Sequence, residues 1–304
     1  MISPKDLITA RIIADSISPQ GIRMTTMEIE YPRFILAELN THRMLSKNSA
    51  SSRAIPVKAM HDHIRANTAA PVYWGVNQPG MKAKEEATGA DLSEAKYIWA
   101  KARDAALAYS ATLADLNIHK QITNRITEPW MIMKTVISGT EWRNFFWLRA
   151  HADAQPEIHE LATKMFDAYN ASTPIELQPG EWHLPYVEHK RNNHGRLEYF
   201  DANGQTLTAV QARVVSASCC AQVSYRKNDD SVEKAQKIFQ QLIESQPCHA
   251  SPVEHQATPM DVDNIEQWEK VDGITHCDRQ HQFWSGNLRG WIQFRKLIPG
   301  EAQW

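Results

Sequence analysis

Four arginines stand in or beside stretches that are dense in polar residues: Arg43, Arg53, Arg125 and Arg149. Arg53 ends the stretch THRMLSKNSASSR (41–53), which mixes hydroxyl, amide and imidazole side chains with hardly a hydrophobic anchor. An arginine fork combined with hydroxyls and loop amides is a common way to hold phosphate. We therefore expect an anion site at this loop. The alternative is a solvated serine-rich turn with ordinary surface arginines.

Arg149 has a setting of its own. It follows the apolar run NFFWL and precedes HADAQPEIHELATKMFDAYN, where hydrophobic residues at helical spacing predict a helix that starts near Asp153, with Pro156 in its first turn. The charge of Arg149 would be partly desolvated near the positive end of that helix. Such a cation normally needs an anion or a polar ligand.

Two histidine-rich segments raise the question of a metal. CHASPVEHQATP places His249, Ser251, Glu254 and His255 around a proline turn, and HCDRQH covers 276–281. Neither has the H-E-x-x-H spacing of a helical zinc motif. The four cysteines form no C-x-x-C pair, so we expect reduced thiols and no metal. A metal-dependent hydrolase is a distant alternative.

The composition argues against several classes of protein. With a net charge of -2 and a pI near 6.7, the chain has no overall field that would attract nucleic acid or an anionic membrane. No apolar run approaches the length of a membrane span, and the first residues do not have the pattern of a signal peptide. We expect a cytoplasmic protein. The G-x-G-x-x-G fingerprint and the P-loop motif are both missing, which argues against those nucleotide sites.

Elements that would position these residues follow from local patterns. Residues 25–41 begin with alternating polar and apolar positions and become a solid apolar run, which predicts a strand leading into a helix that delivers the 41–53 loop. Residues 91–118 predict a long helix whose main role is core packing. Its apolar stripe consists of Leu92, Ala95, Ile98, Trp99, Ala106, Tyr109 and Leu113.

The remaining segments carry weaker signals. We expect a surface excursion over 60–90, and a connection over 172–210 that contains a hairpin around RLEYFDANGQTLTAV. A further helix is expected at about 230–245. The region 260–304 is expected to be a helical addition, whose last helix lies in FWSGNLRGWIQFRKLIPGE and ends before Pro299.

At its polar stretches the chain resembles the flavin-dependent thymidylate synthases. The first signature of that family is Arg-His-Arg, seven residues and Ser, with an Arg two positions further on; here THR (41–43) is followed at that spacing by Ser51 and Arg53. NFFWLRAHADAQPEI resembles the second signature, an Asn, an Arg five residues on and then Ala-Gln-x-Glu-Ile. NRITEP, with Arg125 and Pro129, resembles an intermediate Arg-x-x-x-Pro.

A further match is out of order. In the family, an Ala-Arg-Val-Ser-Tyr strand and a His-x-Ser/Thr-Pro-x-Glu-His turn precede the Arg-His-Arg loop, whereas AQVSY (221–225) and HASPVEH (249–255) come after it here. The simplest interpretation is a circular permutation in which 212–258 corresponds to the N-terminal segment of the family. A coincidental short match is the alternative.

The resemblance implies an α+β fold, with an antiparallel sheet flanked by helices, in a single catalytic domain over 1–304. It also implies a homo-oligomer, a tetramer as in the family. The implied cofactor is FAD, the one-carbon donor is methylenetetrahydrofolate, and the reductant is NADPH or another donor. The implied substrate is a deoxypyrimidine monophosphate, and the reaction needs no cysteine nucleophile.

Site residues carry over position by position. For FAD they are His42, Arg43, Asn144, Ser224 and Ser251, with His249 and Glu254 near the flavin or the folate. For the nucleotide, Ser51, Arg53 and Arg125 would grip the phosphate and sugar, and Arg149 would orient and polarise the pyrimidine, which makes it the catalytic candidate. Glu38 and Asp153 are further nucleotide candidates.

Four departures from the family bear on the choice of base: Thr41 for Arg, Glu38 for Gln, Ser49 for Glu and Asp153 for His. Cytosine presents an amine where uracil presents a carbonyl, so a carboxylate at the base edge would favour cytosine. Asp153 could instead cap the following helix, and Glu38 could pair with a nearby cation. Gln293 and Arg295 could supply the missing amide and guanidinium.

We therefore expect one-carbon transfer to carbon 5, most simply from dUMP to dTMP. Hydroxymethylation of dUMP or dCMP is the nearest alternative, because water rather than hydride would quench the exocyclic methylene. An alternative of another class is a non-catalytic nucleotide-binding or assembly module that kept the fold and lost its flavin site.

Overall fold

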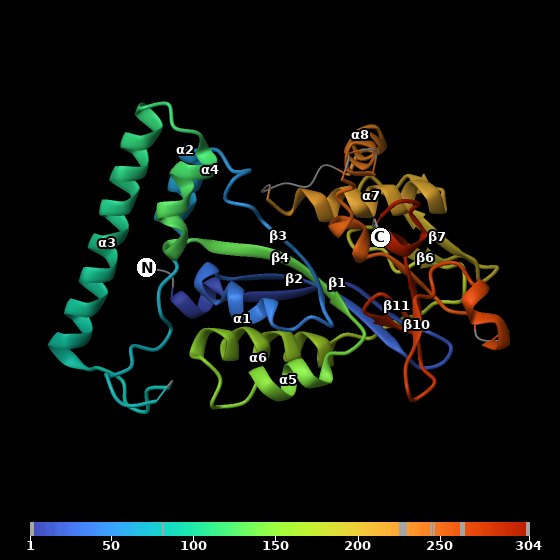
Figure 1. Ribbon diagram of the computed structural model, residues 1–304, viewed down its shortest axis with the longest axis horizontal. Coiled ribbons are helices and arrows are strands. Elements are labelled where there is room, and N and C mark those ends of the chain that lie inside the picture. Colours follow the sequence, from blue (N-terminus) through green and yellow to red (C-terminus); the bar gives the residue numbers. More distant parts are fainter. Residues whose placement is uncertain are drawn as a thin grey trace.

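A five-stranded sheet runs through the middle of the molecule in the order β3-β4-β2-β1-β5 (Figure 1). The computed structural model describes residues 3–80, 82–224, 230–243, 245, 247–261 and 265–301. Neighbouring strands pair antiparallel except β1 and β5, which are parallel. The expected α+β class is confirmed. The strands are β1 (Thr9–Ile17), β2 (Arg23–Pro32), β3 (Ser46–Ser49), β4 (Ile132–Gly139) and β5 (Ile175–Glu176).

Helices α5 (Arg143–Arg149) and α6 (Pro156–Ala171) cover one face of the sheet (Figure 1). Alternate residues of a strand share a face, and on this side β2 presents buried hydrophobic residues that pack against the two helices. They are Met27, Ile29 and Tyr31 from β2, with Phe145, Ile158, Leu161 and Met165 from the helices.

The start of α6 differs from the prediction. The helix begins at Pro156 rather than near Asp153, and its N-cap is Gln155, whose side chain accepts a hydrogen bond from the Ile158 N–H. A proline at the first helical position needs no hydrogen bond to its nitrogen and has the right φ already. Asp153 therefore does not cap the helix.

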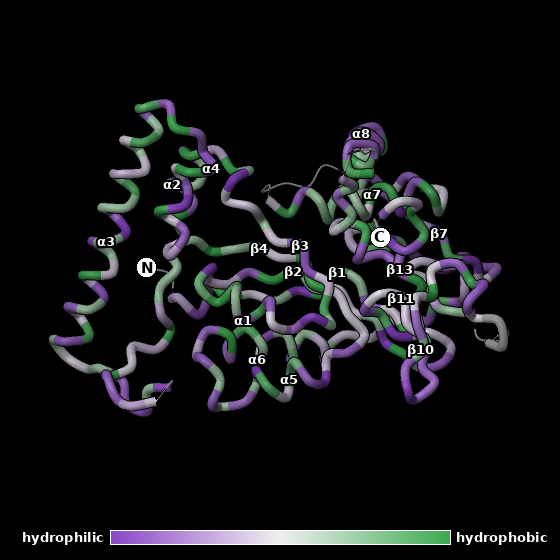
Figure 2. Tube along the Cα trace, viewed as in Figure 1, coloured by the Kyte–Doolittle hydropathy of each residue, from purple (hydrophilic) through white to green (hydrophobic). Residues whose placement is uncertain are grey.

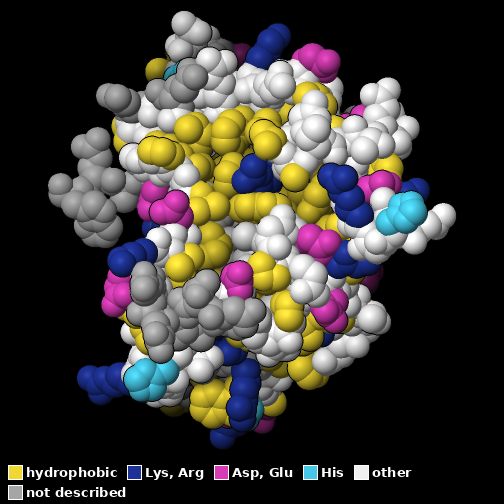
Figure 3. Space-filling model, turned by 90° about the vertical axis from the view of Figure 1, so that its right-hand side faces the viewer, with side chains coloured by type: hydrophobic (Ala, Val, Ile, Leu, Met, Phe, Trp, Pro, Cys, Tyr) yellow, Lys and Arg dark blue, Asp and Glu magenta, His cyan; other side chains and the backbone are white. Residues whose placement is uncertain are grey.

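The C-terminal half covers the opposite face. Helices α7 (Ala209–Ala221) and α8 (Val232–Ile243) lie here, beside a small sheet of β6 (Glu188–Arg191), β7 (Leu197–Phe200) and β8 (Thr206–Leu207). The expected hairpin and the expected helix at 230–245 are thus confirmed. Figure 3 looks onto this half and shows hydrophobic side chains gathered across the middle of the face, with charged side chains around and between them.

β2 leads into the polar loop as predicted. The chain passes from β2 through the short helices η2 (Arg33–Ile35) and α1 (Leu36–Asn40) before it turns at 41–45. The second part of the expected loop is a strand, because β3 pairs with β4 from Ser46 to Ser49. The loop is therefore held by the central sheet on one side.

Three helices stand at one end of the sheet: α2 (Val57–Ala66), α3 (Gly89–Asp115) and α4 (Lys120–Thr123) (Figure 1). The start of the expected surface excursion is wrong, because Met60 and Ile64 of α2 are buried. The helix predicted over 91–118 exists, but its expected role in core packing is wrong. Of α3, Leu107 and Ser110 are buried, whereas Tyr97, Ile98 and Tyr109 are more than half exposed.

The exposure of α3 has a simple cause. Its hydrophobic residues are spread along a helix that lies at the edge of the molecule (Figure 2), where it contacts α2, α4 and the short helix η3 (Asn124–Trp130). Periodicity predicts an amphipathic helix but not what covers its apolar side. Within the described ranges, no helix combines the length and the apolarity that a membrane span requires.

The expected helical addition at the C-terminus is wrong. The segment forms the short strands β9 (Ala257–Pro259), β10 (His276–Cys277), β11 (Phe283–Ser285), β12 (Leu288–Arg289) and β13 (Trp291–Gln293), with short 3-10 helices η6 (Ile265–Lys270) and η7 (Phe294–Leu297). Gly286 and Gly290 have φ of 60° and 69°, a left-handed conformation that interrupts a right-handed helix and favours glycine. β13 then pairs antiparallel with β9.

Candidate active site

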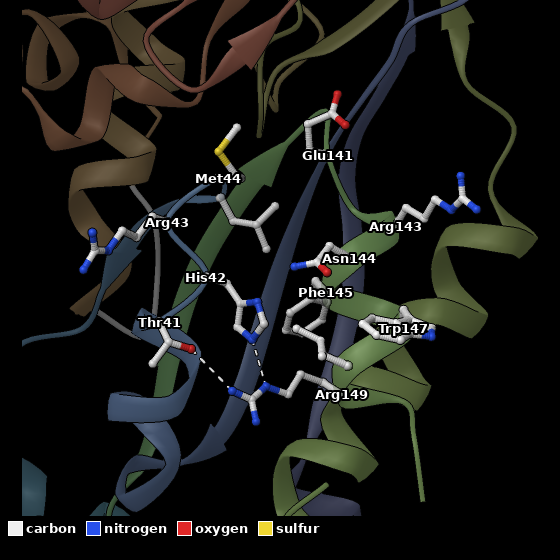
Figure 4. A pocket seen from close by; sticks show the side chains of 12 residues that line it. Thr41, His42, Arg43, Met44, Glu141, Arg143, Asn144, Phe145, Trp147 and Arg149 are labelled. Atoms are coloured by element: carbon white, nitrogen blue, oxygen red, sulfur yellow. Dashed lines mark hydrogen bonds between the residues drawn. The ribbon is translucent and has the colours of Figure 1, made fainter. Parts of the chain in front are cut away.

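A cavity of about 710 Å³ lies between the 41–45 loop and α5 (Figure 4). The two walls come from the two signature stretches, which are about a hundred residues apart in the sequence and are brought together by β4. Its volume is in the range typical of small-molecule and cofactor sites. The lining residues are Thr41, His42, Arg43, Met44, Leu45, Glu141, Arg143, Asn144, Phe145, Trp147, Leu148 and Arg149.

Arg149 joins the two walls. Its Nε donates a hydrogen bond to His42 Nε2 over 2.8 Å, and Nη2 donates to Thr41 Oγ1 over 3.4 Å (Figure 4). Its Nη1 also lies 3.7 Å from a carboxylate oxygen of Glu38. The guanidinium is therefore held in one orientation at the edge of the cavity.

His42 acts as a neutral acceptor in this arrangement. Because its Nε2 accepts from Arg149, the ring proton is on Nδ1. The ring is buried and contacts Phe145 edge-on, with ring centroids 4.9 Å apart. Burial first, and then the neighbouring charges of Arg149 and Lys47, together lower the pKa of His42 to about 4. His42 is thus uncharged at neutral pH.

Lys47 fixes the turn that carries His42. Its Nζ donates to the backbone carbonyls of His42 and Leu45, over 2.6 and 2.8 Å. Burial lowers the pKa of this ammonium to about 8, against the opposing effect of Glu254. The turn between α1 and β3 is therefore closed by a side chain from β3 itself.

The sequence-based candidates left out several residues that line the cavity, among them Arg143 and Trp147. Both are exposed on α5, four residues apart and therefore on the same side of the helix, and Trp147 is 72% exposed. The available signal was their spacing of four residues around the start of the second signature, which begins at Asn144. In Figure 4, Arg43 and Arg143 extend from opposite walls and point away from Arg149.

A second group of candidates lies at the other end of β3. Glu128 accepts hydrogen bonds from Ser52 Oγ over 2.6 Å and from Arg125 over 3.1 Å. Arg53, the residue after Ser52, is exposed. The Ser51 N–H donates to Ser224 Oγ over 2.9 Å. The nucleotide candidates Ser51, Arg53 and Arg125 do not line the Arg149 cavity, so one copy of the chain holds the expected nucleotide residues in two separate groups.

The out-of-order segments pack against β3 from the other side. Ser224 belongs to η4 (Gln222–Ser224), and Ser251 and Glu254 belong to η5 (Ser251–Glu254). Ser251 Oγ donates to Asn48 Oδ1 over 3.5 Å. In the family the segment that corresponds to AQVSY is a strand, whereas here it ends in the 3-10 helix η4, up to residue 224. The last position of AQVSY, residue 225, lies outside the described residues.

The other candidates are distributed as follows. His249 is exposed and does not line the Arg149 cavity. Gln293 and Arg295 contact Glu254: Gln293 Nε2 donates to its backbone carbonyl over 3.1 Å, and Arg295 forms an ion pair with its carboxylate. Both residues therefore lie beside the flavin candidate Glu254, and neither lines the Arg149 cavity. Asp153, whose side chain is 85% exposed, lines a different cavity of about 580 Å³.

The described part of the chain contains no group of three or more His, Cys, Asp or Glu residues that could hold a metal ion. His255 of the histidine-rich turn is fully buried and bonded to Ser138 Oγ over 2.8 Å. None of the four cysteines, all of which the structure describes, forms a disulfide.

A match to a protein family agrees with the signatures. The family described as thymidylate synthase complementing protein matches residues 6–175. One similar solved structure is the UMP/dUMP methylase PolB from Streptomyces cacaoi bound with 5-Br UMP, with 16% identity, a TM-score of 0.44 and coverage of 53% of this chain and 88% of that one. Another is the flavin-dependent thymidylate synthase ThyX from Helicobacter pylori complexed with FAD and dUMP, with 20% identity, a TM-score of 0.33 and coverage of 48% and 67%.

No curated protein sequence matches the chain. The family match, however, extends over more than half of the chain and contains the 41–53 loop and the stretch around Arg149. The chain belongs to the thymidylate synthase complementing protein family, the flavin-dependent thymidylate synthases.

Proposed function

We propose that this protein transfers a one-carbon unit from methylenetetrahydrofolate to carbon 5 of a deoxypyrimidine monophosphate with the help of FAD, and that its main reaction converts dUMP to dTMP. The observation that carries the proposal is the contact between Arg149 and His42, which joins the two family signatures at one cavity. A guanidinium held in a fixed orientation can bind a carbonyl oxygen of the pyrimidine and stabilise negative charge on the ring.

The cavity fits a flat anionic cofactor. Arg43, Arg143 and Arg149 surround it with positive charge, which favours the phosphates of FAD. Trp147 and Met44 offer exposed apolar surface to a planar ring. Bound flavin would supply the redox chemistry, with NADPH or another donor as reductant, while the protein binds and orients the reactants. Of the flavin candidates, His42, Arg43 and Asn144 line this cavity.

We infer that the complete site forms between copies of the chain. Ser51, Arg53 and Arg125 lie apart from the Arg149 cavity, and the guanidiniums of Arg53 and Arg125 are exposed. A second copy would place these residues beside the first copy's Arg149, as the tetramer expected from the family requires.

We also propose that the chain is one catalytic domain with permuted motif order. η4 and η5 flank β3, and the Ser224–Ser51 and Ser251–Asn48 hydrogen bonds bring the out-of-order segments to the first signature. Such contacts support a permutation, since a permuted chain keeps the same spatial neighbours. Ser224, Ser251 and Glu254 would then reach FAD from this side.

A second candidate substrate is dCMP. Glu38 Oε2 lies 3.7 Å from Arg149 Nη1, which places an acceptor close to the residue proposed to hold the pyrimidine. A carboxylate there can accept from the exocyclic amine of cytosine. Neither Glu38 nor Asp153 lines the cavity itself, and Glu38 carries this alternative because it lies beside Arg149. The product could be either the methylated or the hydroxymethylated nucleotide.

The test is a product assay. The purified protein is incubated with FAD, a reductant, methylenetetrahydrofolate and either dUMP or dCMP, and the products are identified by mass spectrometry. The main proposal expects methylated dUMP. A product from dCMP alone would favour the second candidate, and a Glu38→Gln variant should then shift the preference back to dUMP. A protein that binds FAD and nucleotide but forms no product would contradict both.

A further inference from the structure

The β11–β12 hairpin, residues 283–289, lies outside the region that matches the family. It nevertheless contacts both walls of the Arg149 cavity. It reaches one wall through Asn287, in the turn, and the other through Arg289, at the end of β12. Two residues that are neighbours on one hairpin thus contact segments that lie on opposite sides of the cavity.

Asn287 holds the first wall. Its Nδ2 donates to the Met44 carbonyl over 3.1 Å and to Ser46 Oγ over 3.0 Å. Met44 lines the cavity, and Ser46 is the buried first residue of β3. The side chain of Asn287 therefore fixes the point where the signature loop enters the sheet.

Arg289 holds the second wall. Its Nε donates to Glu141 Oε1 over 2.6 Å, and its backbone N–H donates to Thr140 Oγ1 over 3.1 Å. Glu141 lines the cavity two residues before α5 begins. The direction in which α5 leaves the sheet determines where Asn144 and Arg149 lie, so this contact acts on both.

The hairpin is itself anchored in the core. Leu288 and Ser285 are fully buried, and Ser285 Oγ accepts from the Gln293 N–H over 3.0 Å. The side chain of Gln293 also donates to Asn287 Oδ1 over 3.2 Å. A rigid support of this kind can hold two walls at a fixed separation, whereas a mobile loop would follow them.

We propose that Asn287 and Arg289 are positioning residues of the active site, and that the β11–β12 hairpin holds the two walls of the cavity at the separation that the flavin and the nucleotide require. The proposal rests on the function proposed above for the choice of ligand. The contacts themselves are independent of it.

If the Arg289–Glu141 pair served only stability, its removal would lower the melting temperature and leave the cavity unchanged. We expect the opposite result. The side chains of Arg289 and Glu141 are 30% and 32% exposed, and ion pairs of this exposure contribute little to the free energy of unfolding. Removing the pair should therefore hardly change the melting temperature. Cavity geometry is more sensitive, because displacements of about 1 Å in a site can reduce its rate by about two orders of magnitude.

The experiment compares the wild-type protein with Asn287→Ala, Arg289→Ala and Arg289→Lys. Arg191→Ala is the matched control, because Arg191 pairs with Glu181 at a similar exposure, 33% and 21%, and neither residue lines the cavity. The measurements are hydrogen–deuterium exchange of the segments 41–46 and 140–149 without ligand, the dissociation constant of FAD, kcat and KM for dUMP, and the melting temperature.

We expect exchange about tenfold faster in 41–46 for Asn287→Ala and in 140–149 for Arg289→Ala, with FAD bound about tenfold more weakly and kcat reduced. Arg289→Lys keeps a cation for Glu141 and should give intermediate values. Arg191→Ala should match the wild type in all of these. Melting temperatures should agree among Arg289→Ala, Arg191→Ala and the wild type within a few degrees.

Two failures can be told apart. Unchanged exchange in both segments would overturn the proposal for the hairpin, whatever happens to FAD. Faster exchange with unchanged FAD binding and kcat would also overturn it, because the hairpin would then support the fold alone. A wild-type protein that binds no FAD would instead refute the proposed function, while the exchange data would still decide whether the hairpin holds the walls.

Discussion

Arg149 and His42 form a hydrogen bond of 2.8 Å in which the imidazole is the acceptor and the guanidinium the donor. The two residues belong to different signatures, and their contact defines how the 41–45 loop faces α5. A histidine is more often considered as a base or a cation in a nucleotide site. Here its neutral form is required, because a protonated ring would place two positive charges together.

His42→Ala should therefore lower kcat/KM for the nucleotide by about a hundredfold, because Arg149 loses the acceptor that orients it. His42→Gln offers a carbonyl oxygen as acceptor and should recover part of the loss. Thr41→Ala removes a longer contact of 3.4 Å and should cost less than tenfold. Steady-state kinetics with the three variants measures kcat/KM and checks whether His42→Ala loses the most. Equal activity of His42→Ala and the wild type would contradict it.

The charge state of His42 gives a separate prediction. Its pKa is lowered to about 4 in the folded protein, mainly by burial. The ring should therefore stay neutral as the pH falls from 8 to 5.5, whereas an exposed histidine would titrate near 6.5. The chemical shifts of the ring, followed by NMR in protein with labelled histidine, would show this directly. A titration with a midpoint near 6.5 would argue against the hydrogen bond to Arg149.

Local sequence patterns predicted the part of the site that depends on local structure. The alternating and then apolar residues of 25–41 predicted the strand and helix that deliver His42, and the signature spacing indicated Arg149. Arg143 and Trp147 were missed, although they follow directly from the helix that carries Arg149.

Contacts between distant segments could not be predicted in this way. Arg289 and Glu141 are 148 positions apart, and nothing near either residue indicates the other. The aromatic and aliphatic residues of the C-terminal segment suggested a helix, but two glycines with positive φ divide it into short strands. The stripe of α3 was read correctly as helical, yet its exposure depends on the arrangement of whole helices.

Trp147 should contribute to ligand binding with little effect on stability. At 72% exposure its indole packs against little of the protein, so Trp147→Ala should leave the melting temperature within a few degrees of wild type. A planar ring bound in the cavity would lose a stacking partner, and we expect FAD to bind about tenfold more weakly. Trp147→Phe should restore most of the affinity. Fluorescence titration measures the affinity for FAD. Equal affinities of the wild type, Trp147→Ala and Trp147→Phe would contradict this role.

Buried histidines should make the fold sensitive to acid. Ser16, His183, Thr26, Ser138 and His255 form a continuous hydrogen-bonded chain between the sheet and the C-terminal half, with bonds of 2.6–2.9 Å. All five side chains are fully buried. Burial lowers the pKa of both His183 and His255 to about 3. In the unfolded chain both would titrate near 6.5.

The sign of the effect follows from proton binding. Below about pH 6.5 the unfolded chain binds protons that the folded protein excludes, so the free energy of unfolding falls as the pH decreases toward 3, and this contribution is fully present above 6.5. Each histidine should contribute a slope of about 1.4 kcal/mol per pH unit in that window. Urea unfolding at pH 7, 6 and 5 measures the total. His183→Gln should reduce the slope; a slope that did not change would show that other groups cause it.

A mixing experiment tests whether one site takes residues from two copies of the chain. Arg149→Ala removes one group of nucleotide residues, and Arg53→Ala removes the other, which lies away from the Arg149 cavity. Each variant alone should be nearly inactive. If the groups meet between copies, coexpression of the two variants creates some sites in which both arginines are intact, about a quarter of all sites for random assembly.

The matched control combines Arg149→Ala with His42→Ala. Both changes fall in the same cavity of one copy, one on each of its walls, so neither copy can supply an intact Arg149 cavity, and mixing should restore no activity beyond that of the separate variants. Recovery in the first mixture and its absence in the control would identify a shared site. If Arg53→Ala and Arg149→Ala failed to complement each other while both still assembled with wild-type chains, Ser51, Arg53 and Arg125 would have to act within their own copy, and the 41–53 loop would need to move to reach Arg149.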